Sequence, residues 1–518
     1  MLLRESLSKA ARFFSQKEAI ICEGDRFTYG EFTDRVYRLA NGLKGLGIGK
    51  DGKVAILHPN CHVFMEAYYS AALIGAALVP INYRLSPREI AFILEDSESQ
   101  LLIASPDVKA IVEEIGGSVE GVAEVLFSGR GGSYEDFLSE SSGEPPPPVA
   151  MDGTDLAQIY YTSGTTGRPK GVMLSHGNVA SHALGTIAEF HLTDSDVWIH
   201  VAPMFHLADA WATWAITWIG GTHVMVSHFQ PKKVLETIER ERVTLTNMIP
   251  TMLNLLINEP GVEGYDCSSL RVLLSGGAPI APDVVRRIIE TFGCDYIQTY
   301  GMTETSPYLT VSILKEHLKR LPYEEQLRYK SKTGREFIGV ELKVVREDGT
   351  EVDPDDQEVG EIIVRGEIVT RGYWKLPEET QKSIRDGWLY TGDMAVIDGE
   401  GYINIVDRKK DMILTGGENV YSTEVEHVLY KHPVVLEAAV VGVPDEKWGE
   451  AVKAVVVLKK GQLVPAQEII EFCKENMAHY KSPKSVDFVT SLPKTGSGKI
   501  HKKSIRDGYW EGYEKKVQ

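Results

Sequence analysis

The sequence predicts an α/β protein of more than one domain, and three observations carry that prediction. With 518 residues, the chain exceeds the length at which a single hydrophobic core keeps growing. Its 43% hydrophobic and 25% charged residues are typical of soluble globular proteins. Between residues 27 and 103, short apolar runs alternate with longer amphipathic segments, which is the pattern of strands and helices in an α/β layer.

The elements of this first layer follow from local signals. Thr28 precedes a helical pattern that runs to Leu46, and its hydroxyl is suited to cap that helix. The next predicted elements are a buried strand at 54–58, an apolar helix at 63–75, and a strand with a turn at 77–84. Four consecutive prolines mark residues 139–149 as a stiff extended linker. We expect this linker to separate the first layer from the subdomain that follows.

Charge and cysteine usage narrow the partners and the compartment. The formal net charge of −18 argues against a general nucleic-acid surface and favours solubility. No apolar run is long enough to span a bilayer, and the first residues predict an amphipathic helix instead of a signal peptide. The cysteines are scattered and odd in number, so we expect buried thiols in a reducing, cytoplasmic location, with peripheral membrane contact left open. They are Cys22, Cys61, Cys267, Cys294 and Cys473.

Residues 160–171 are the most informative stretch, because they concentrate donors for a phosphate. The hydroxyls are those of Thr162, Ser163, Thr165 and Thr166, and two cations, Arg168 and Lys170, follow. Small residues let backbone N–H groups turn towards one point, where hydroxyls and cations add donors. The loop is not a Walker A motif, because no glycine precedes Lys170 and no Ser or Thr follows it. Its flanks predict short strands, so the loop should join strand to strand; a solvated turn is the alternative.

The run Tyr161-Thr-Ser-Gly-Thr-Thr-Gly-Arg-Pro-Lys-Gly171 resembles the signature loop of the adenylate-forming superfamily, which includes acyl-CoA synthetases, luciferases and peptide-synthetase adenylation domains. The resemblance covers nearly the whole chain. It implies a large N-terminal domain of layered α/β subdomains with a β-barrel-like subdomain, at residues 1–408, and a small mobile α+β domain at 409–518. It assigns to ATP the loop residues Thr162, Ser163, Gly164, Thr165, Thr166, Gly167 and Lys170.

Residues 202–209 lead into a predicted helix with Trp211, Trp214 and Trp218 on one face. Core packing is the ordinary explanation for such a stripe. The resemblance implies instead that this helix lines the acyl pocket and that His206 lies near the substrate carboxylate. The residues expected to shape the pocket are Phe205, Trp211, Gly276 and Tyr308. These segments contain no charged residue suited to bind a second carboxylate of the substrate. An apolar acid is therefore expected, and its chain length and aromaticity are left open.

Two buried strands, ending near residues 276 and 301, are predicted to reach the nucleotide. Glycines at the end of the first let a flat group approach the backbone. By resemblance, Tyr300 stacks on adenine, Thr303 bonds the α-phosphate, and Glu304 holds Mg2+ together with phosphate oxygens. Asp393, in an intact Tyr-Thr-Gly-Asp run, matches the residue that binds both ribose hydroxyls. The remaining expected ATP contacts are Gly277, Ala278, Pro279, Gln298, Thr299 and Gly301.

A run of five charged residues between two apolar strands marks the predicted domain boundary. Such a run is usually a solvated crossing, but in the family the matching segment is a hinge. There Arg408 contacts the nucleotide and Lys410 is the pivot. Gly416 and Gly417 match a loop that enters the site for thioester formation, where glycine lets backbone pass beside pantetheine. Lys499 matches the lysine that bridges the carboxylate and α-phosphate oxygens.

Together these motifs imply an ATP- and Mg2+-dependent ligase that adenylates a mostly apolar acid, such as a fatty acid, and then forms its thioester with coenzyme A. The residues assigned to catalysis are Lys499, His206, Thr303 and Glu304. The expected partners are small molecules, with no nucleic acid and no integral membrane segment, and a homodimer is left open. The alternatives are an aryl-CoA ligase, a carrier-protein-loading acyl-AMP ligase and, with least support, a non-catalytic nucleotide-binding protein.

Overall fold

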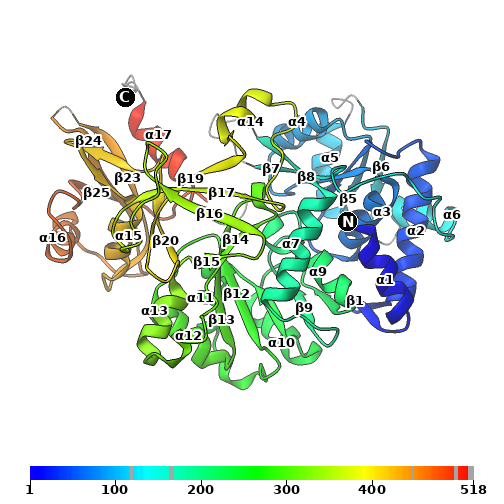
Figure 1. The fold of residues 1–518 in the computed structure, drawn as a ribbon, viewed down its shortest axis with the longest axis horizontal. Helices are drawn as coiled ribbons and strands as arrows, with labels where there is room; N and C mark the ends of the chain where they lie inside the picture. Colours follow the sequence, from blue (N-terminus) through cyan, green and yellow to red (C-terminus); the bar gives the residue numbers. More distant parts are fainter. Residues whose placement is uncertain (117–120, 130, 163–168, 446, 495–499, 512–518) are drawn as a thin grey trace. The chain divides into compact units, whose positions relative to one another are not determined.

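The computed structural model describes residues 1–116, 121–129, 131–162, 169–445, 447–494 and 500–511 (Figure 1). The chain divides into two compact units, Met1–Leu342 with Val364–Leu389, and Lys343–Ile363 with Tyr390–Gln518. The division falls inside three strands, β16 (Val340–Val345), β17 (Gly360–Gly366) and β19 (Trp388–Ile397). The expected boundary after residue 408 refers to a movement between functional states and stays a prediction.

The first unit contains a nine-stranded sheet with the order β15-β14-β13-β12-β11-β9-β10-β1-β2. The strands from β13 to β1 in this order are parallel to one another, whereas β14, β15 and β2 are antiparallel to their neighbours. Parallel strands end at one edge, so β12 and β13 finish side by side, with Gly276 opposite Thr299. The strands are β1 (Glu18–Cys22), β2 (Asp25–Thr28), β9 (Val197–His200), β10 (Thr222–Met225), β11 (Leu245–Asn247), β12 (Val272–Gly276), β13 (Asp295–Gly301), β14 (Tyr308–Val311) and β15 (Arg335–Glu336).

A second sheet of the first unit has six strands in the order β6-β5-β3-β4-β7-β8. All its pairs are parallel except the last, where β8 runs antiparallel to β7. Its strands are β3 (Lys53–Leu57), β4 (Ala77–Pro80), β5 (Leu101–Ala104), β6 (Glu124–Phe127), β7 (Leu156–Thr162) and β8 (Lys170–Ser175). The strands predicted from the sequence at 54–58 and 77–84 are therefore confirmed, and both lie in this sheet.

The proline-rich segment at 139–149 does not separate two subdomains, so that expectation was wrong. The strands on either side of the phosphate loop join the sheet of the first layer, with Leu78 of β4 opposite Gln158 of β7. The reason lies in helix α2 (Tyr29–Gly45), whose polar side chains bind the carbonyls of the segment. Asn41 donates to the carbonyls of Ser142 and Glu144, each at 2.8 Å. The segment thus runs along α2 and returns the chain to the same sheet.

Helices cover both sheets, and their ends follow the capping rules. Thr28 caps α2 as predicted, since its hydroxyl accepts from the Glu31 N–H while the Glu31 carboxylate accepts from the Thr28 N–H. The other helices of the first unit are α1 (Arg4–Phe14), α3 (His62–Ile74), α4 (Pro87–Ser97), α5 (Lys109–Ile115), α6 (Ser133–Glu140), α7 (His176–Glu189), α8 (Leu207–Ala210), α9 (Ala212–Ile219), α10 (Pro231–Glu241), α11 (Pro250–Ile257), α12 (Pro282–Phe292), α13 (Tyr323–Ser331) and α14 (Pro377–Ser383).

The nine-stranded sheet buries a different core on each face, because successive side chains of a strand point to opposite sides. On β12, Leu274 joins a core that includes Trp211, whereas Leu273 joins the core built with α10, α11 and α12. On β13, Ile297 and Tyr296 divide in the same way. The predicted buried thiols are confirmed, since all five cysteines are free and buried.

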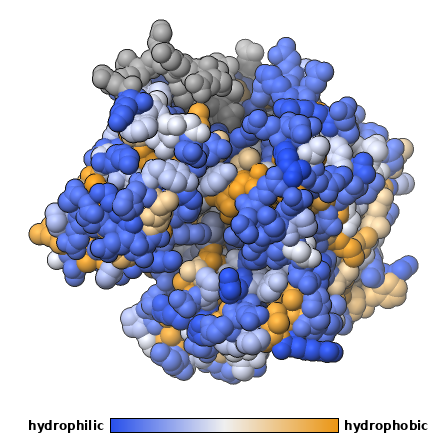
Figure 2. All heavy atoms as spheres, turned by 60° about the vertical axis from the view of Figure 1, so that its left-hand side comes forward, coloured by the Kyte–Doolittle hydropathy of each residue, from blue (hydrophilic) through white to orange (hydrophobic). Residues whose placement is uncertain are grey.

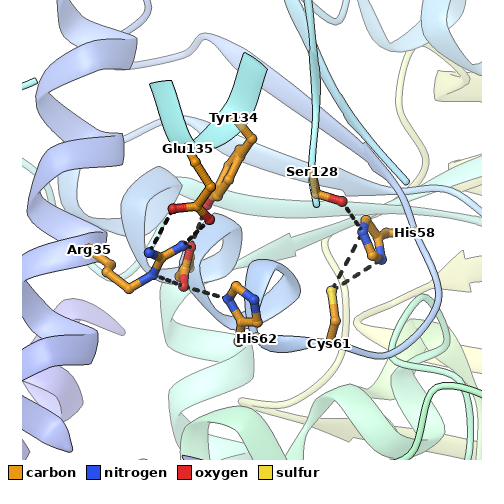
Figure 3. A network of polar contacts seen from close by, with 8 residues as sticks. Arg35, His58, Cys61, His62, Ser128, Tyr134 and Glu135 are labelled. Carbon is orange, nitrogen blue, oxygen red and sulfur yellow. Dashed lines mark hydrogen bonds and ion pairs between the residues drawn. The ribbon is translucent and has the colours of Figure 1, made fainter. Parts of the chain in front are cut away.

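A buried carboxylate, Glu66 of α3, connects α2, α3 and α6 of the first unit, and its partners Arg35, His62 and Tyr134 are labelled in Figure 3. It accepts from Arg35 Nε of α2 at 2.6 Å, from the Tyr134 hydroxyl of α6 at 2.6 Å, and pairs with His62 Nδ1 at 2.8 Å. Burial alone would raise the pKa of Glu66, but His62 and Arg35 hold it at about 2. The network is therefore a buried set of ion pairs and hydrogen bonds that connects the helices.

A cysteine–histidine contact lies beside this network, with Cys61 Sγ 3.1 Å from His58 Nδ1 (Figure 3). His58 Nε2 also contacts the Ser128 hydroxyl at 2.7 Å. Burial raises the pKa of the Cys61 thiol and lowers the pKa of His58 to about 4. An activated nucleophile needs the opposite shift of the thiol, so this contact is structural.

The second unit has a sheet of its own with the order β22-β21-β24-β23, and β25 lies beside β24. Its apolar core includes Val425 of α15 and Ile469 of α16. Strand β20 (Ile403–Arg408) pairs antiparallel with β19. The remaining elements are β21 (Ile413–Thr415), β22 (Glu418–Val420), α15 (Ser422–Tyr430), β23 (Val435–Asp445), β24 (Gly449–Leu458), α16 (Ala466–Asn476), β25 (Ser485–Phe488) and α17 (Lys502–Trp510); β18 (Ile384–Arg385) belongs to the first unit.

None of the described helices combines the length and the apolar composition needed to cross a bilayer. The longest of them, α2, has 17 residues and carries charged side chains along its exposed face. Figure 2 shows a mostly hydrophilic face, on which apolar residues gather in small separate groups.

Candidate active site

The predicted phosphate loop is flanked by two paired strands, as the sequence indicated. Thr162, the last residue of β7, lies opposite Lys170, the first residue of β8. The loop therefore begins and ends at one point of the six-stranded sheet. Ser163, Gly164, Thr165, Thr166 and Gly167 lie outside the described residues, so their expected contacts with ATP stay a prediction.

Lys170 is placed by two residues that the sequence did not single out. Its amine forms an ion pair with Glu379 of α14, and it lies 5.4 Å from the centre of the Tyr373 ring. Only 12% of the Lys170 side chain is exposed. The hydrogen bond from Lys170 holds the pKa of Glu379 down at about 2, with a second contribution from Lys382. The loop cation is thus neutralised by a carboxylate 209 positions away in the sequence.

Tyr373 also connects this cation to the predicted metal ligand. Its hydroxyl donates to Glu304 Oε1 at 3.0 Å, and the Thr370 N–H donates to the Glu304 carbonyl at 2.7 Å. Glu304 lies in a single 3-10 turn, Thr303–Thr305, and is 7% exposed. Lys170, Tyr373 and Glu304 therefore form one connected group in the first unit.

A Mg2+ ion fits the chemistry of Glu304. Magnesium is commonly held by one or two carboxylates together with phosphate oxygens, instead of a cage made only of protein. Among the residues that the structure describes, no cluster of three or more His, Cys, Asp or Glu could hold a metal alone. One buried carboxylate connected through Tyr373 to the lysine of the predicted phosphate loop matches the mixed type of site.

The ends of β12 and β13 bring the predicted nucleotide residues together. The Gln298 amide donates to the Ala278 carbonyl at 2.9 Å, and the Thr299 hydroxyl donates to the Ser275 carbonyl at 3.1 Å. Gly301 is required by packing, because a Cβ there would lie 1.8 Å from the Pro307 carbonyl oxygen. Gly277, Ala278 and Pro279 are exposed next to this edge, and Tyr300, Gly301 and Thr303 are partly exposed.

Trp211 lies at the centre of an aromatic group on the same face of the sheet. Its ring centre is 4.8 Å from that of Trp198 and 5.4 Å from that of Tyr308. His182 and Phe190 lie about its other sides, at 6.0 and 6.2 Å. A Cβ at Gly276 would lie 2.6 Å from the Thr299 hydroxyl, so Gly276 packs directly against the strand that leads to Tyr300.

The prediction of a single helix with an aromatic face is wrong. The chain forms two short helices, α8 and α9, which are interrupted at Trp211. Trp214 packs against Tyr68 and Tyr69 of α3, with ring centres at 5.7 and 4.7 Å, and not against the neighbours of Trp211. The spacing in sequence could not reveal that the two indoles have different surroundings.

His206 and Phe205 lie just before Trp211, at the start of α8. His206 is the N-cap of α8, and its Nδ1 accepts from the Ala208 N–H at 3.4 Å. Phe205 is buried against Tyr83, with ring centres 5.5 Å apart. The predicted carboxylate-facing histidine is thus held at the start of α8, the helix that ends just before Trp211.

In the second unit, the predicted ribose and hinge residues are neighbours. Asp393 of β19 lies opposite Arg408 of β20, and Arg408 Nε lies 3.3 Å from Asp393 Oδ1. Lys410 follows two residues later in an exposed turn that the Arg408 carbonyl closes by accepting from the Asp411 N–H at 2.9 Å. Partial desolvation of its amine by neighbouring groups, together with Arg408, lowers the pKa of Lys410.

Gly416 and Gly417 form the tight turn between β21 and β22. Both have positive φ, at 61° and 88°, which glycine adopts without strain. A Cβ at Gly416 would lie 2.6 Å from the Trp448 ring, and the Gly416 N–H donates to the Trp448 carbonyl at 2.9 Å. Trp448 is 45% exposed, so this turn lies against an exposed indole that the sequence did not single out.

Lys499 lies outside the described residues, but the chain on either side of it is placed. Lys494 and Ile500 form a bridge, and α17 begins at Lys502. The Lys502 amine lies 2.8 Å from Glu426 Oε1 and 2.7 Å from the Ser422 hydroxyl. The predicted catalytic lysine therefore stands three positions before a residue fixed on α15.

Comparisons with known proteins find similarity over nearly the whole chain. Residues 7–374 match the family described as AMP-binding enzyme, and residues 424–499 match the AMP-binding enzyme C-terminal domain. Among relatives, the feruloyl-CoA synthase of an Amycolatopsis species is 39% identical over 96% of this chain and 97% of that protein. The 4-hydroxybutyrate–CoA ligase 2 of Metallosphaera sedula is 34% identical over 97% and 93%. The long-chain-fatty-acid–CoA ligase of Thermus thermophilus is 36% identical over 99% and 96%.

A solved structure is also similar over its full length. ATP-bound MatB from Rhodopseudomonas palustris superposes with a TM-score of 0.88 at 31% identity, covering 99% of this chain and 100% of that one. The mixed α/β architecture predicted from the sequence is thereby confirmed.

Proposed function

The chain belongs to the AMP-binding enzyme family, and from that premise we propose that it joins a mostly apolar carboxylic acid, a fatty acid or a related acid, to coenzyme A. It is an AMP-forming acyl-CoA synthetase, which uses ATP and coenzyme A as substrates. What we propose is the class of acid that it uses, its binding of Mg2+, the residues of its site, and a domain movement between its two half-reactions.

In the first half-reaction, a carboxylate oxygen of the acid attacks the α-phosphorus of ATP in line, and pyrophosphate leaves. Charge builds on the phosphoryl oxygens, so fixed cations and donors aimed at them lower the barrier. We assign that role to Lys499, Thr303 and Lys170. When bound at Glu304, Mg2+ would neutralise charge on the phosphates. No protein nucleophile is needed.

In the second half-reaction, the thiol of coenzyme A attacks the acyl carbonyl carbon, and AMP leaves with its bonding electrons. Asp393 is proposed to bind the ribose, with Arg408 beside it. The turn at Gly416 and Gly417 is proposed to lie along the pantetheine arm, and a rotation at Lys410 to exchange this turn for Lys499. The domains that rotate would be residues 1–408 and 409–518.

The observation that carries the proposed acid class is the aromatic group around Trp211. Tyr308, which packs on Trp211, lies close to Thr299, one residue before the predicted adenine-stacking Tyr300, so an acid placed there would have its carboxylate near the nucleotide. Buried aromatic rings favour an apolar acyl group. An aryl-CoA ligase is the second candidate, because a relative named feruloyl-CoA synthase acts on an aromatic acid and the surroundings of Trp211 suit a ring. A carrier protein as acyl acceptor is a further alternative.

Two general properties complete the proposal. We expect the enzyme in the cytoplasm, since its cysteines are free thiols. Measurement of the mass in solution would decide whether the enzyme is a homodimer.

The test is pyrophosphate release with ATP and Mg2+ against a panel of acids, with and without coenzyme A. Straight chains of graded length, cyclohexane carboxylate, benzoate and cinnamates sample the acid classes. Acid-dependent release that coenzyme A accelerates, and that Lys499→Ala abolishes, is the expected result. Release unaffected by coenzyme A would point to a carrier-protein acceptor. Folded enzyme that binds ATP and releases no pyrophosphate with any acid would contradict the proposal.

A further inference from the structure

Among the described residues of the nine-stranded sheet, two buried polar atoms on the Trp211 face have no hydrogen-bond partner. They are Oδ1 of Asn247, at the end of β11, and the hydroxyl of Tyr308, at the start of β14. The residues are 4% and 3% exposed, so bulk water does not reach them freely. Buried polar atoms in folded proteins are nearly always bonded, and one left unbonded costs free energy. A ligand bound at the proposed acyl site would supply the missing partners.

The orientation of Asn247 is fixed by its other end. Its amide nitrogen donates to the Ala208 carbonyl at 2.6 Å, and Trp211 Nε1 donates to the same carbonyl at 3.0 Å. Because a carbonyl only accepts, the amide nitrogen must face Ala208, and Oδ1 is the unpartnered atom. An amide oxygen can be satisfied only by a donor. The missing partner is therefore an O–H or N–H group, and not an ether or a ketone.

Tyr308 packs against Trp211 and is also held in place. Its backbone N–H donates to His182 Nε2 at 3.2 Å, and its ring packs on Trp211 and on His182. Trp211 and Thr299 lie close to the phenol hydroxyl, although neither bonds it in good geometry. The hydroxyl can donate or accept, so it adds a second hydrogen-bonding position.

Resting on the proposed function, we propose that the acid carries a hydroxyl group as well as its carboxylate, and that this hydroxyl donates to Asn247 Oδ1. Tyr308 supplies the second polar contact, and the aromatic rings around Trp211 bind the apolar body between the two ends. The substrate class is thus a hydroxylated carboxylic acid, aliphatic or aromatic. An ordered water on Asn247 is the competing explanation, and it predicts no preference for a hydroxyl.

Acids of equal shape distinguish these explanations, because a methyl group replaces a hydroxyl with almost no change in volume. The pairs are 4-hydroxybenzoate with 4-methylbenzoate, 4-hydroxycinnamate with 4-methylcinnamate, and 4-hydroxybutyrate with pentanoate. A site built to bond a hydroxyl rejects the analogue that lacks it. In the pair with the higher turnover, we expect kcat/KM for the hydroxylated acid to exceed that of its methyl partner by about tenfold or more.

Three variants connect the preference to these residues. Tyr308→Phe removes an unbonded hydroxyl, so it should leave the thermal midpoint unchanged or raise it, while the preference falls by at least about threefold. Asn247→Leu should abolish the preference. Tyr29→Phe is the matched control, since it removes a buried hydroxyl that donates to the Gly221 carbonyl at 2.6 Å away from the site. It should lower the thermal midpoint and leave the preference intact.

If the enzyme turns over the methyl acids well, and each has a kcat/KM equal to or higher than that of its hydroxylated partner, the inference is overturned. The synthetase proposal would survive that result. An unchanged preference in Tyr308→Phe and in folded Asn247→Leu would also overturn it. No turnover with any acid of the panel would instead contradict the proposed function.

Discussion

In the proposed site, the carboxylate of Glu379 and the phosphates of ATP would compete for one cation, Lys170. The Glu379→Gln substitution removes the competing charge and keeps the shape of the side chain. We expect the dissociation constant for ATP to fall by about three- to tenfold, which is the range for a partly buried ion pair. Titration calorimetry with ATP in the absence of acid measures the change.

Lys382 provides the matched control for this substitution, because it is the other partner of Glu379. Its amine lies 2.9 Å from Glu379 Oε1, and its side chain is 67% exposed. Lys382→Gln should therefore change the ATP dissociation constant by less than about twofold. Weaker ATP binding in Glu379→Gln would mean that the carboxylate holds Lys170 in its binding position, and the competition would be disproved.

Helix α17 links the segment after Lys499 to the proposed hinge. Lys502 bonds Ser422 and Glu426 of α15, and Ser422 in turn donates to Asp407 Oδ2 at 2.8 Å. One turn further along α17, Arg506 donates to the Lys410 carbonyl at 2.6 Å. The two basic side chains have the i, i+4 spacing of one helix face. Through these bonds, α17 would couple the two parts that the proposed rotation at Lys410 moves.

We expect Lys502→Met to slow formation of the acyl-AMP more than its transfer to coenzyme A. The variant leaves Glu426 and Asp407 buried without their cation, and it frees the end of the segment that carries Lys499. Loss of one partner of a buried ion pair costs about 3 kcal/mol of unfolding free energy. Single-turnover measurements of each half-reaction, the second started from preformed acyl-AMP, separate the two effects.

Two further variants decide whether the position or the charge matters. Lys502→Arg keeps the cation and should restore most of the adenylation rate. Lys460→Gln removes an exposed cation elsewhere in the second unit and should leave both half-reactions unchanged. Equal slowing of both half-reactions in Lys502→Met would mean a general loss of stability, and the positioning role would be rejected.

Local signals predicted the elements well and the side-chain partners poorly. The cap at Thr28, the strands on either side of the phosphate loop and the glycines at 416 and 417 depend on neighbours in sequence, and the structure has them. The ion pair of Lys170 with Glu379 depends on the path of the chain between them, which no local pattern contains. The same holds for the proline-rich segment, whose course is set by side chains of α2.

The whole molecule has separate cores in its two units, so the units should unfold as separate events. Ile469 is fully buried in the core of the second unit, and Glu66 is fully buried in the first. Calorimetry should show two transitions. Ile469→Ala should lower only one of them, by about 3 kcal/mol of unfolding free energy, and Glu66→Gln only the other, by a similar amount.

Acid titration of the same transitions tests the Glu66 network further. The pKa of Glu66 falls from 4.5 to about 2 in the folded protein, so the carboxylate stabilises the fold above pH 4.5. Below that pH the unfolded chain binds the proton first, and the stabilisation is lost progressively as the pH approaches 2. We expect the first-unit transition to fall steeply over this window in the natural chain and less steeply in Glu66→Gln. The Ile469→Ala variant should keep the natural slope for that transition. If the first-unit transition falls equally steeply with pH in Glu66→Gln and in the natural chain, other carboxylates dominate acid unfolding. The proposed ionic connection between α2, α3 and α6 would then lose its support.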